Sequence, residues 1–479
     1  MASKPSVFLD TNWKEIAPQR SVTADTFAQG SILFSFNVSG LNSISLKDSY
    51  FLIKSSLVNG NGNVPHILAN KTTYAHNWTS ALFTNVSFNV SGVEISSCNQ
   101  FNHLAHTLKM RQMIDDGELK TNYRDLMDFD PDFTRRLNRH CAAGPREDGL
   151  LEEANAGAPI RSGDISRYTV YKPVNLGVFD LDHGAICGDI QITLNPNPNY
   201  LTACVESAFI NANNFVAALP GAAQPVGGPP NYRFQVEEIK FMACYAKVTA
   251  PITTTATFAI KEYQVQNKPY ATQLEFQVTP STEQITVFIQ DQSAGNSTII
   301  PSTAFKVRQY LHNEQTGWVN GYGKQFTADE QASFQVTLGA TTKPPIMLKP
   351  QVNVPGRQYQ LIRWLMSNQY LQCEPPPGGF MDGQSGGHKT IWERFNEWAS
   401  SPYFTFDFAR DATDTSGFVT VMSMYDFSGY AQNPPLAAQA VTWPNGGQLP
   451  NLFCCSRFVK QVKITYNSGY VTDVQIQNT

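Results

Sequence analysis

Short runs of alternating apolar and polar residues, each closed by turn-forming residues, recur along this chain. Residues 31–38 and 50–58 show the pattern clearly, and the second run ends in Asn59-Gly60-Asn61-Gly62, where Asn and Gly tolerate positive φ. A period of two residues places apolar side chains on one face of a strand, which favours antiparallel sheets with one buried face. Many short strands at regular spacing are typical of sandwiches and barrels, so we predict an all-β fold.

The alternation predicts further strands in both halves of the chain. Residues 85–90 and 93–95 flank Ser91-Gly92 and are expected to form a hairpin, whereas a strand at 189–194 ends where prolines follow. In the second half, the predicted strands are 232–237, 239–248, 255–265, 273–278, 284–289, 333–338, 403–408, 418–425 and 458–466.

Helical character is confined to a few segments. Residues 101–139 are rich in Leu, Met and charged side chains, and they predict one helix near 100–115 and a shorter one near 132–139. A third helix is predicted at 388–400, where Ile391, Phe395 and Trp398 follow helical spacing.

The length of 479 residues suits two domains, and a Pro/Gly-rich stretch from Leu219 to Pro230 is the best linker candidate. We therefore expect two eight-stranded jelly-roll sandwiches in tandem, with short helical inserts. The expected division is an N-terminal arm at 1–27, a first jelly roll at 28–218, a linker at 219–230 and a second jelly roll at 231–479.

Charged residues are only 15% of the chain, aromatic residues are 12%, and the formal net charge is −4. This composition excludes a disordered chain, and it provides no overall basic field that would gather nucleic acid. The sequence shows no apolar signal-peptide core and no run of about 18 apolar residues, so we expect neither secretion nor a membrane span.

The eight cysteines form no Cys-x-x-Cys pair, and they are too few for a disulfide scaffold, so we expect buried free thiols. Cys454 and Cys455 should not be bonded to each other, because adjacent strand residues point to opposite faces. Sequons begin at Asn37, Asn70, Asn77, Asn85, Asn89 and Asn296, and we interpret them as polar residues of strands and turns.

One segment, Gly383-Gln384-Ser385-Gly386-Gly387, matches the Gly-x-Ser-x-Gly pattern of hydrolases. That motif needs a strand entering the serine and a helix leaving it. Here a Pro/Gly-rich stretch precedes the serine, so we interpret the segment as a surface loop.

Two groups of residues raise the possibility of a metal site. Asp180, Asp182, His183 and Asp189 are close in sequence, but a turn between strands explains them better than a divalent cation does. His103 and His106 lie three residues apart on the predicted helix, yet no paired Cys/His set completes a zinc site, so we interpret them as hydrogen-bonded structural histidines.

The most basic tract could face nucleic acid, but acidic residues interleave with it throughout. A solvated face of mixed charge is the better interpretation. The basic residues are Lys109, Arg111, Lys120, Arg124, Arg135, Arg136, Arg139 and His140.

Five parts of the chain share, in order, the strand patterns of one known family, and they are residues 46–54 with 57–62, 79–97, 189–201, 232–248, and 401–411 with 417–421. These segments resemble strands of the double jelly-roll major capsid proteins of Polinton-like viruses, adintoviruses and virophages. The resemblance departs from the family at Phe101-Asn102-His103-Leu104, where a more aromatic, Pro-containing helix entry is expected.

This resemblance implies a major capsid protein of an icosahedral DNA virus, made in the host cytoplasm and located in the virion. Its homotrimers would form pseudo-hexagonal capsomers. The implied partners are other copies of the chain, penton and minor capsid proteins, with an internal membrane as a further candidate. No enzyme activity, catalytic residue, cofactor, metal, small-molecule substrate or sequence-specific nucleic acid is expected.

Two other functions stay open at the level of sequence. The first is a glycan-binding or glycan-cleaving β-sandwich protein, which would need exposed aromatic residues beside a pair of carboxylates. The second is a capsid or spike protein with a single jelly roll, against which the central linker and the renewed series of strands argue.

Overall fold

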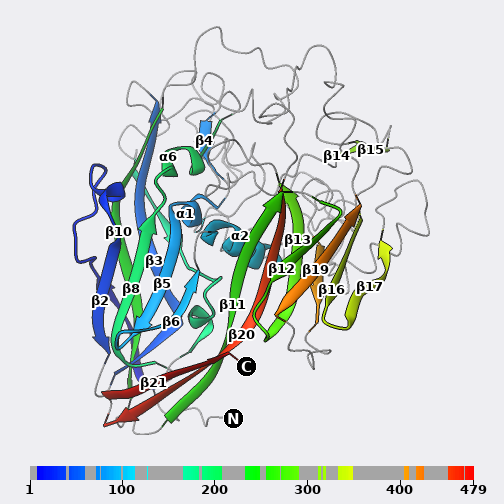
Figure 1. Ribbon diagram of the computed structural model, residues 1–479. Helices are drawn as coiled ribbons and strands as arrows, with labels where there is room; N and C mark the ends of the chain where they lie inside the picture. The colour runs from blue at the N-terminus through cyan, green and yellow to red at the C-terminus, as the bar shows by residue number, and fades with distance from the viewer. Residues whose placement is uncertain are drawn as a thin grey trace, which may run out of the picture.

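In the computed structural model, the described part of the chain forms two β-sandwiches that stand side by side (Figure 1). Every strand pairing in this part is antiparallel, which confirms the predicted all-β class. The structure describes residues 8–38, 42–59, 72–75, 77–98, 101–113, 127, 166–182, 186–207, 232–248, 255–269, 271–290, 311–313, 317–319, 333–348, 404–408, 417–424, 451–468 and 470–478.

The first sandwich consists of two four-stranded sheets with an aromatic core between them. Phe34 of one sheet packs on Phe51 and Phe241 of the other, with ring centroids 5.3 and 6.4 Å apart. One sheet has the order β1 (Phe8–Ile16), β10 (Tyr232–Val248), β3 (Asn42–Asn59) and β7 (Ser166–Tyr171). The other has the order β2 (Ile32–Val38), β8 (Gly188–Pro196), β5 (Phe83–Val90) and β6 (Val93–Cys98).

In the second sandwich, the chain crosses repeatedly from one sheet to the other, as in a jelly roll, and two pairs of successive strands form hairpins within a single sheet. One sheet has the order β11 (Thr255–Pro269), β20 (Asn451–Asn467), β13 (Thr282–Gln290) and β18 (Phe404–Asp407), with β21 (Tyr470–Asn478) also paired to β20. The other has the order β12 (Gln273–Gln277), β19 (Phe418–Met424), β16 (Ser333–Leu338) and β17 (Thr341–Leu348).

Smaller elements connect these sheets. Two pairs of short strands are β4 (Thr72–Tyr74) with β9 (Val205–Ser207), and β14 (Leu311–Asn313) with β15 (Gly317–Val319). The helices are α1 (Trp78–Ala81), α2 (Asn102–Met113) and α6 (Tyr200–Ala203), and the 3₁₀ turns are η1 (Phe27–Gln29) and η3 (Gly177–Asp180).

The local sequence patterns are confirmed where the structure describes them. Each predicted strand falls on an observed one, and the β5–β6 hairpin turns at Ser91 and Gly92, both with positive φ (48° and 83°). This geometry is the type I′ turn that suits two antiparallel strands. Helix α2 lies where a helix was predicted near 100–115, whereas the helices predicted at 132–139 and 388–400 lie outside the described residues.

Strand pairing corrects the expected division of the chain. Strand β10, which was assigned to the second jelly roll, lies between β1 and β3 in the first sandwich, and the second sandwich begins at β11. Part of the predicted N-terminal arm is strand β1 of that same sheet. Alternation identifies a strand but not its partner, so the period of β10 alone could not assign it to a sandwich. The predicted linker at 219–230 lies outside the described residues.

The cysteine prediction is confirmed for the described residues. Cys98, Cys187, Cys204, Cys244, Cys454 and Cys455 are all buried and free, so the vicinal pair in β20 is not bonded. Among the sequons, Asn37, Asn85 and Asn89 lie in strands, and Asn77 is buried beside α1. In the part of the chain that the structure describes, no helix is long and apolar enough to cross a membrane.

Candidate functional site: the seam between the two sandwiches

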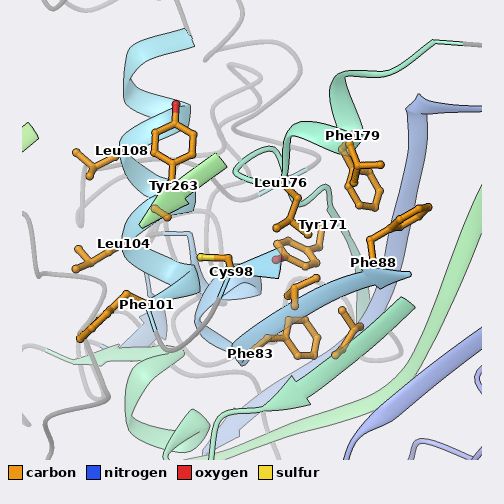
Figure 2. Packing of buried hydrophobic residues seen from close by; sticks show 14 of the residues in the cluster. Phe83, Phe88, Cys98, Phe101, Leu104, Leu108, Tyr171, Leu176, Phe179 and Tyr263 are labelled. Atoms are coloured by element: carbon orange, nitrogen blue, oxygen red, sulfur yellow. The ribbon is translucent and has the colours of Figure 1, made fainter. Parts of the chain in front are cut away.

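The two sandwiches meet along a buried interface, here called the seam, formed by β6, α2 and η3 of the first half and β11, β20 and β21 of the second. Phe101, just before α2, packs edge-on against Phe453 of β20, with ring centroids 6.0 Å apart. Figure 2 shows Tyr263 of β11 beside α2, which contributes Leu104 and Leu108. Most of the buried apolar residues of the two sandwiches form one continuous cluster, so the seam is an extension of the two cores.

Two glycines allow the two halves of the chain to approach closely at the seam. A Cβ atom on Gly177 in η3 would lie 2.5 Å from the backbone N and O of Lys261 in β11. A Cβ on Gly188 would lie 2.5 Å from Cγ2 of Val471 in β21, and the φ of +112° at Gly188 also disfavours other residues. The seam therefore depends on the absence of side chains at these two positions.

Among the described residues, a single carboxyl group is buried in the seam. Glu262 of β11 is only 3% exposed, and Oε1 accepts a short hydrogen bond from Ser96 Oγ of β6. Oε2 accepts a second bond from the backbone N–H of Ser97, at 3.3 Å. Burial raises the pKa of Glu262 to about 7, although Lys460 and the two donors act in the opposite direction.

Sequence analysis missed Glu262, but a signal was present. In the predicted strand at 255–265, the two-residue period places Glu262 on the same face as Phe258 and Ile260. A carboxylate in register with apolar residues is unusual, because a charged group is rarely buried without partners. The partner strand β6 could not be inferred, since it lies more than 160 residues away.

A second buried polar region, here called the polar core, lies where α1 meets α2 and comprises Asn77, Ser80, Asn102, His103 and His106. Asn77 Nδ2 donates to His106 Nδ1 at 2.9 Å, and His106 Nε2 lies 2.7 Å from the carbonyl oxygen of Lys172. His103 Nδ1 lies 2.8 Å from Ser80 Oγ. Both histidines are therefore hydrogen-bonded core residues, as the sequence interpretation favoured.

The electrostatics of the polar core favour neutral imidazoles. Burial lowers the pKa of His103 to about 3, with a further contribution from His106, and burial lowers the pKa of His106 to about 4. A hydroxyl beside an imidazole resembles a nucleophile and its base, but Ser80 is fully buried and no substrate could reach it.

The structure does not assemble the remaining sequence motifs into a site among the residues that it describes. Asp180 lies 3.6 Å from Lys109 as an ion pair, Asp189 accepts a hydrogen bond from Asn37, and His183 lies outside the described residues. Among the residues that the structure describes, no group of three His, Cys, Asp or Glu side chains could hold a metal ion. The loop at 383–387 and the basic tract beyond α2 lie outside the described residues.

One outer surface bears on the glycan alternative, because Tyr168 of β7 is exposed beside Glu237 and Glu238 of β10. Each carboxylate is already engaged by a lysine: Glu237 by Lys54 at 3.3 Å, and Glu238 by Lys240 at 3.1 Å. This arrangement is an ion-pair network across a sheet face.

Comparison with known proteins identifies the fold. Neither a scan against protein-family models nor a search of curated proteins finds a match. A chain of the Sputnik virophage structure matches with a TM-score of 0.53 and 9% identity, covering 98% of this chain and 89% of that one. Further similar structures are the PBCV-1 virus capsid (TM-score 0.48, 11% identity, 98% of each chain) and the mavirus major capsid protein (0.47, 10%, 100% of this chain and 94% of that one).

At 9% identity, the Sputnik match shows the fold alone. The architecture is the double jelly roll that the resemblance implied, and the two sandwiches rule out the alternative with a single jelly roll.

Proposed function

We propose that this chain is a major capsid protein of an icosahedral DNA virus. Three copies form a homotrimeric capsomer with a pseudo-hexagonal outline, and these capsomers tile the shell. The observation that carries the proposal is the pair of sandwiches held side by side by a continuous core, together with the likeness to a chain of the Sputnik virophage structure. Two similar units in each of three copies give six units around a three-fold axis, which approximates a hexagon.

The proposed role is structural rather than enzymatic, and its location is the virion. Partners are neighbouring capsomers, penton and minor capsid proteins, with an internal membrane as a further candidate. The sheet edges support an obligate oligomer, because strands such as β1 and β21 each pair on one side only among the described residues, and unpaired edges invite association. We therefore expect no stable isolated monomer.

Size-exclusion chromatography with light scattering tests the proposal. The expected result is a species of three chain masses that persists on dilution. A monomer that binds immobilised oligosaccharides, and loses this binding in a Tyr168→Ala variant, would instead support the glycan alternative.

A further inference from the structure

Glu262 lies where a change in its protonation state affects the seam between the two sandwiches. Its strand belongs to the second sandwich, and both of its hydrogen-bond donors, Ser96 and Ser97, belong to the first. The contact joins β6 to β11, two strands that pack against each other without pairing in one sheet. A change in the charge of this carboxyl group therefore acts directly on the seam.

The surroundings of Glu262 offer little compensation for a negative charge. The charged and titratable groups that act on it come from two elements, and they are Glu94 and Cys98 of β6 and Lys460 of β20. Helix α2 and η3 also pack on β11, but their charged groups Lys109 and Asp180 pair with each other. Of these charged groups, only Lys460 favours the ionised form of Glu262. Among the described residues, Glu262 itself forms no ion pair.

We propose that Glu262 is a proton-sensitive joint, which holds the two sandwiches together when its carboxyl group is protonated and weakens the seam when it ionises. The protonated group needs no counter-charge in the apolar seam, and it keeps its hydrogen bonds to β6. Ionisation transfers the proton to solvent and leaves a buried negative charge with two donors and, among the described residues, one nearby cation, Lys460.

The direction of the pH dependence follows from the shift. The pKa of Glu262 in the folded chain is raised from 4.5 to about 7, so its protonated form is favoured by folding. The stabilising contribution is fully present below about pH 4.5 and is lost as the pH rises through about 7. The contact lies within one chain, so the effect does not require that copies of the chain assemble into a shell.

The test compares thermal unfolding of the wild type, Glu262→Gln and Glu275→Gln between pH 4.5 and pH 8.5. Gln resembles the protonated carboxyl but cannot ionise, so the wild type should lose several degrees relative to Glu262→Gln as the pH rises through about 7. Glu275 is an exposed carboxylate on β12, in the other sheet of the second sandwich, so its variant should follow the wild type throughout. Parallel profiles for the wild type and Glu262→Gln would overturn the proposal.

Infrared spectroscopy provides a direct second readout. The wild type should show a protonated-carboxyl band that disappears as the pH rises through about 7, and Glu262→Gln should lack it. If Glu262→Gln fails to fold, Ser96→Ala replaces it: removing a donor that favours the ionised form should move the band's titration to higher pH. A band that titrates only at the pH of ordinary carboxylates, or is unmoved by Ser96→Ala, would contradict the proposal.

Discussion

The polar core and the seam both bury titratable side chains, but they favour opposite protonation states. In the polar core, His103 and His106 accept or donate bonds as neutral imidazoles, and burial lowers the pKa of each. In the seam, burial raises the pKa of Glu262. Burial disfavours the charged form in both regions, so a base and an acid respond to pH with opposite sign.

This difference has a consequence between about pH 4.5 and pH 6.5, where both regions change together. As the pH falls, the histidines lower the free energy of unfolding, because they bind protons in the unfolded chain but stay neutral in the buried polar core. Over the same fall in pH, Glu262 raises the free energy of unfolding, because it binds a proton in the folded seam at pH values where it is ionised in the unfolded chain. The two contributions oppose each other and flatten the pH profile of the wild type.

The largest expected effect is the loss of Asn102 from the polar core. Its Nδ2 donates to the carbonyl oxygens of Ser80 and Phe83 and to the hydroxyl of Tyr171, and its Oδ1 accepts from Asn175. Asn102→Ala leaves these buried groups without that partner, so the free energy of unfolding should fall by ~3 kcal/mol or more in chemical denaturation.

The exposed Asn12 on β1 is the control for this prediction. Asn12→Ala should change the free energy of unfolding by less than ~0.5 kcal/mol. Equal effects of the two substitutions would contradict a structural role for the polar core.

The next largest effect concerns the seam. A methyl group at Gly177 would meet the backbone of Lys261, which cannot move without displacing β11, so Gly177→Ala should destabilise the chain by ~1–3 kcal/mol. Gly417 offers a matched control, because a Cβ there would lie at an ordinary 3.7 Å from its nearest neighbour. Thermal unfolding measures both variants. Equal melting temperatures for Gly177→Ala and Gly417→Ala would show that the backbones at the seam are not as close as described.

A smaller effect separates the two regions by pH. His106→Gln removes a titrating group from the polar core, so the wild type should lose stability relative to this variant as the pH falls from 6.5 to 4.5, by on the order of 2 kcal/mol. Glu262→Gln should show the opposite: over the same fall in pH, the free energy of unfolding of the wild type should rise relative to that of this variant. Urea titrations at both pH values measure these differences, and equal signs for the two variants would refute the comparison.

The smallest effect is expected at Ser385, which lies outside the described residues. If its Gly-rich segment is a surface loop, Ser385→Ala should change stability by less than ~0.5 kcal/mol and leave assembly unchanged. Hydrolase activity in the wild type that disappears in the variant would show that the segment is a catalytic motif.

The sequence predicted strands well but not their partners. Periodicity identified β10 and β11 because alternation is a local property, but it could not assign β10 to the first sandwich, since the pairing of Phe241 with Phe51 depends on residues almost 200 positions apart. The same limit applies to the seam. Glu262 was missed although its place on an apolar face was a usable signal, whereas Gly177 has no local pattern that would reveal its contact with Lys261.

The central claim, that this chain is the building block of a viral shell, is tested most directly by electron microscopy of the purified protein. The proposal predicts particles with three-fold symmetry and a pseudo-hexagonal outline, in which each of three copies contributes two lobes of density. Isolated two-lobed particles at every protein concentration would contradict it.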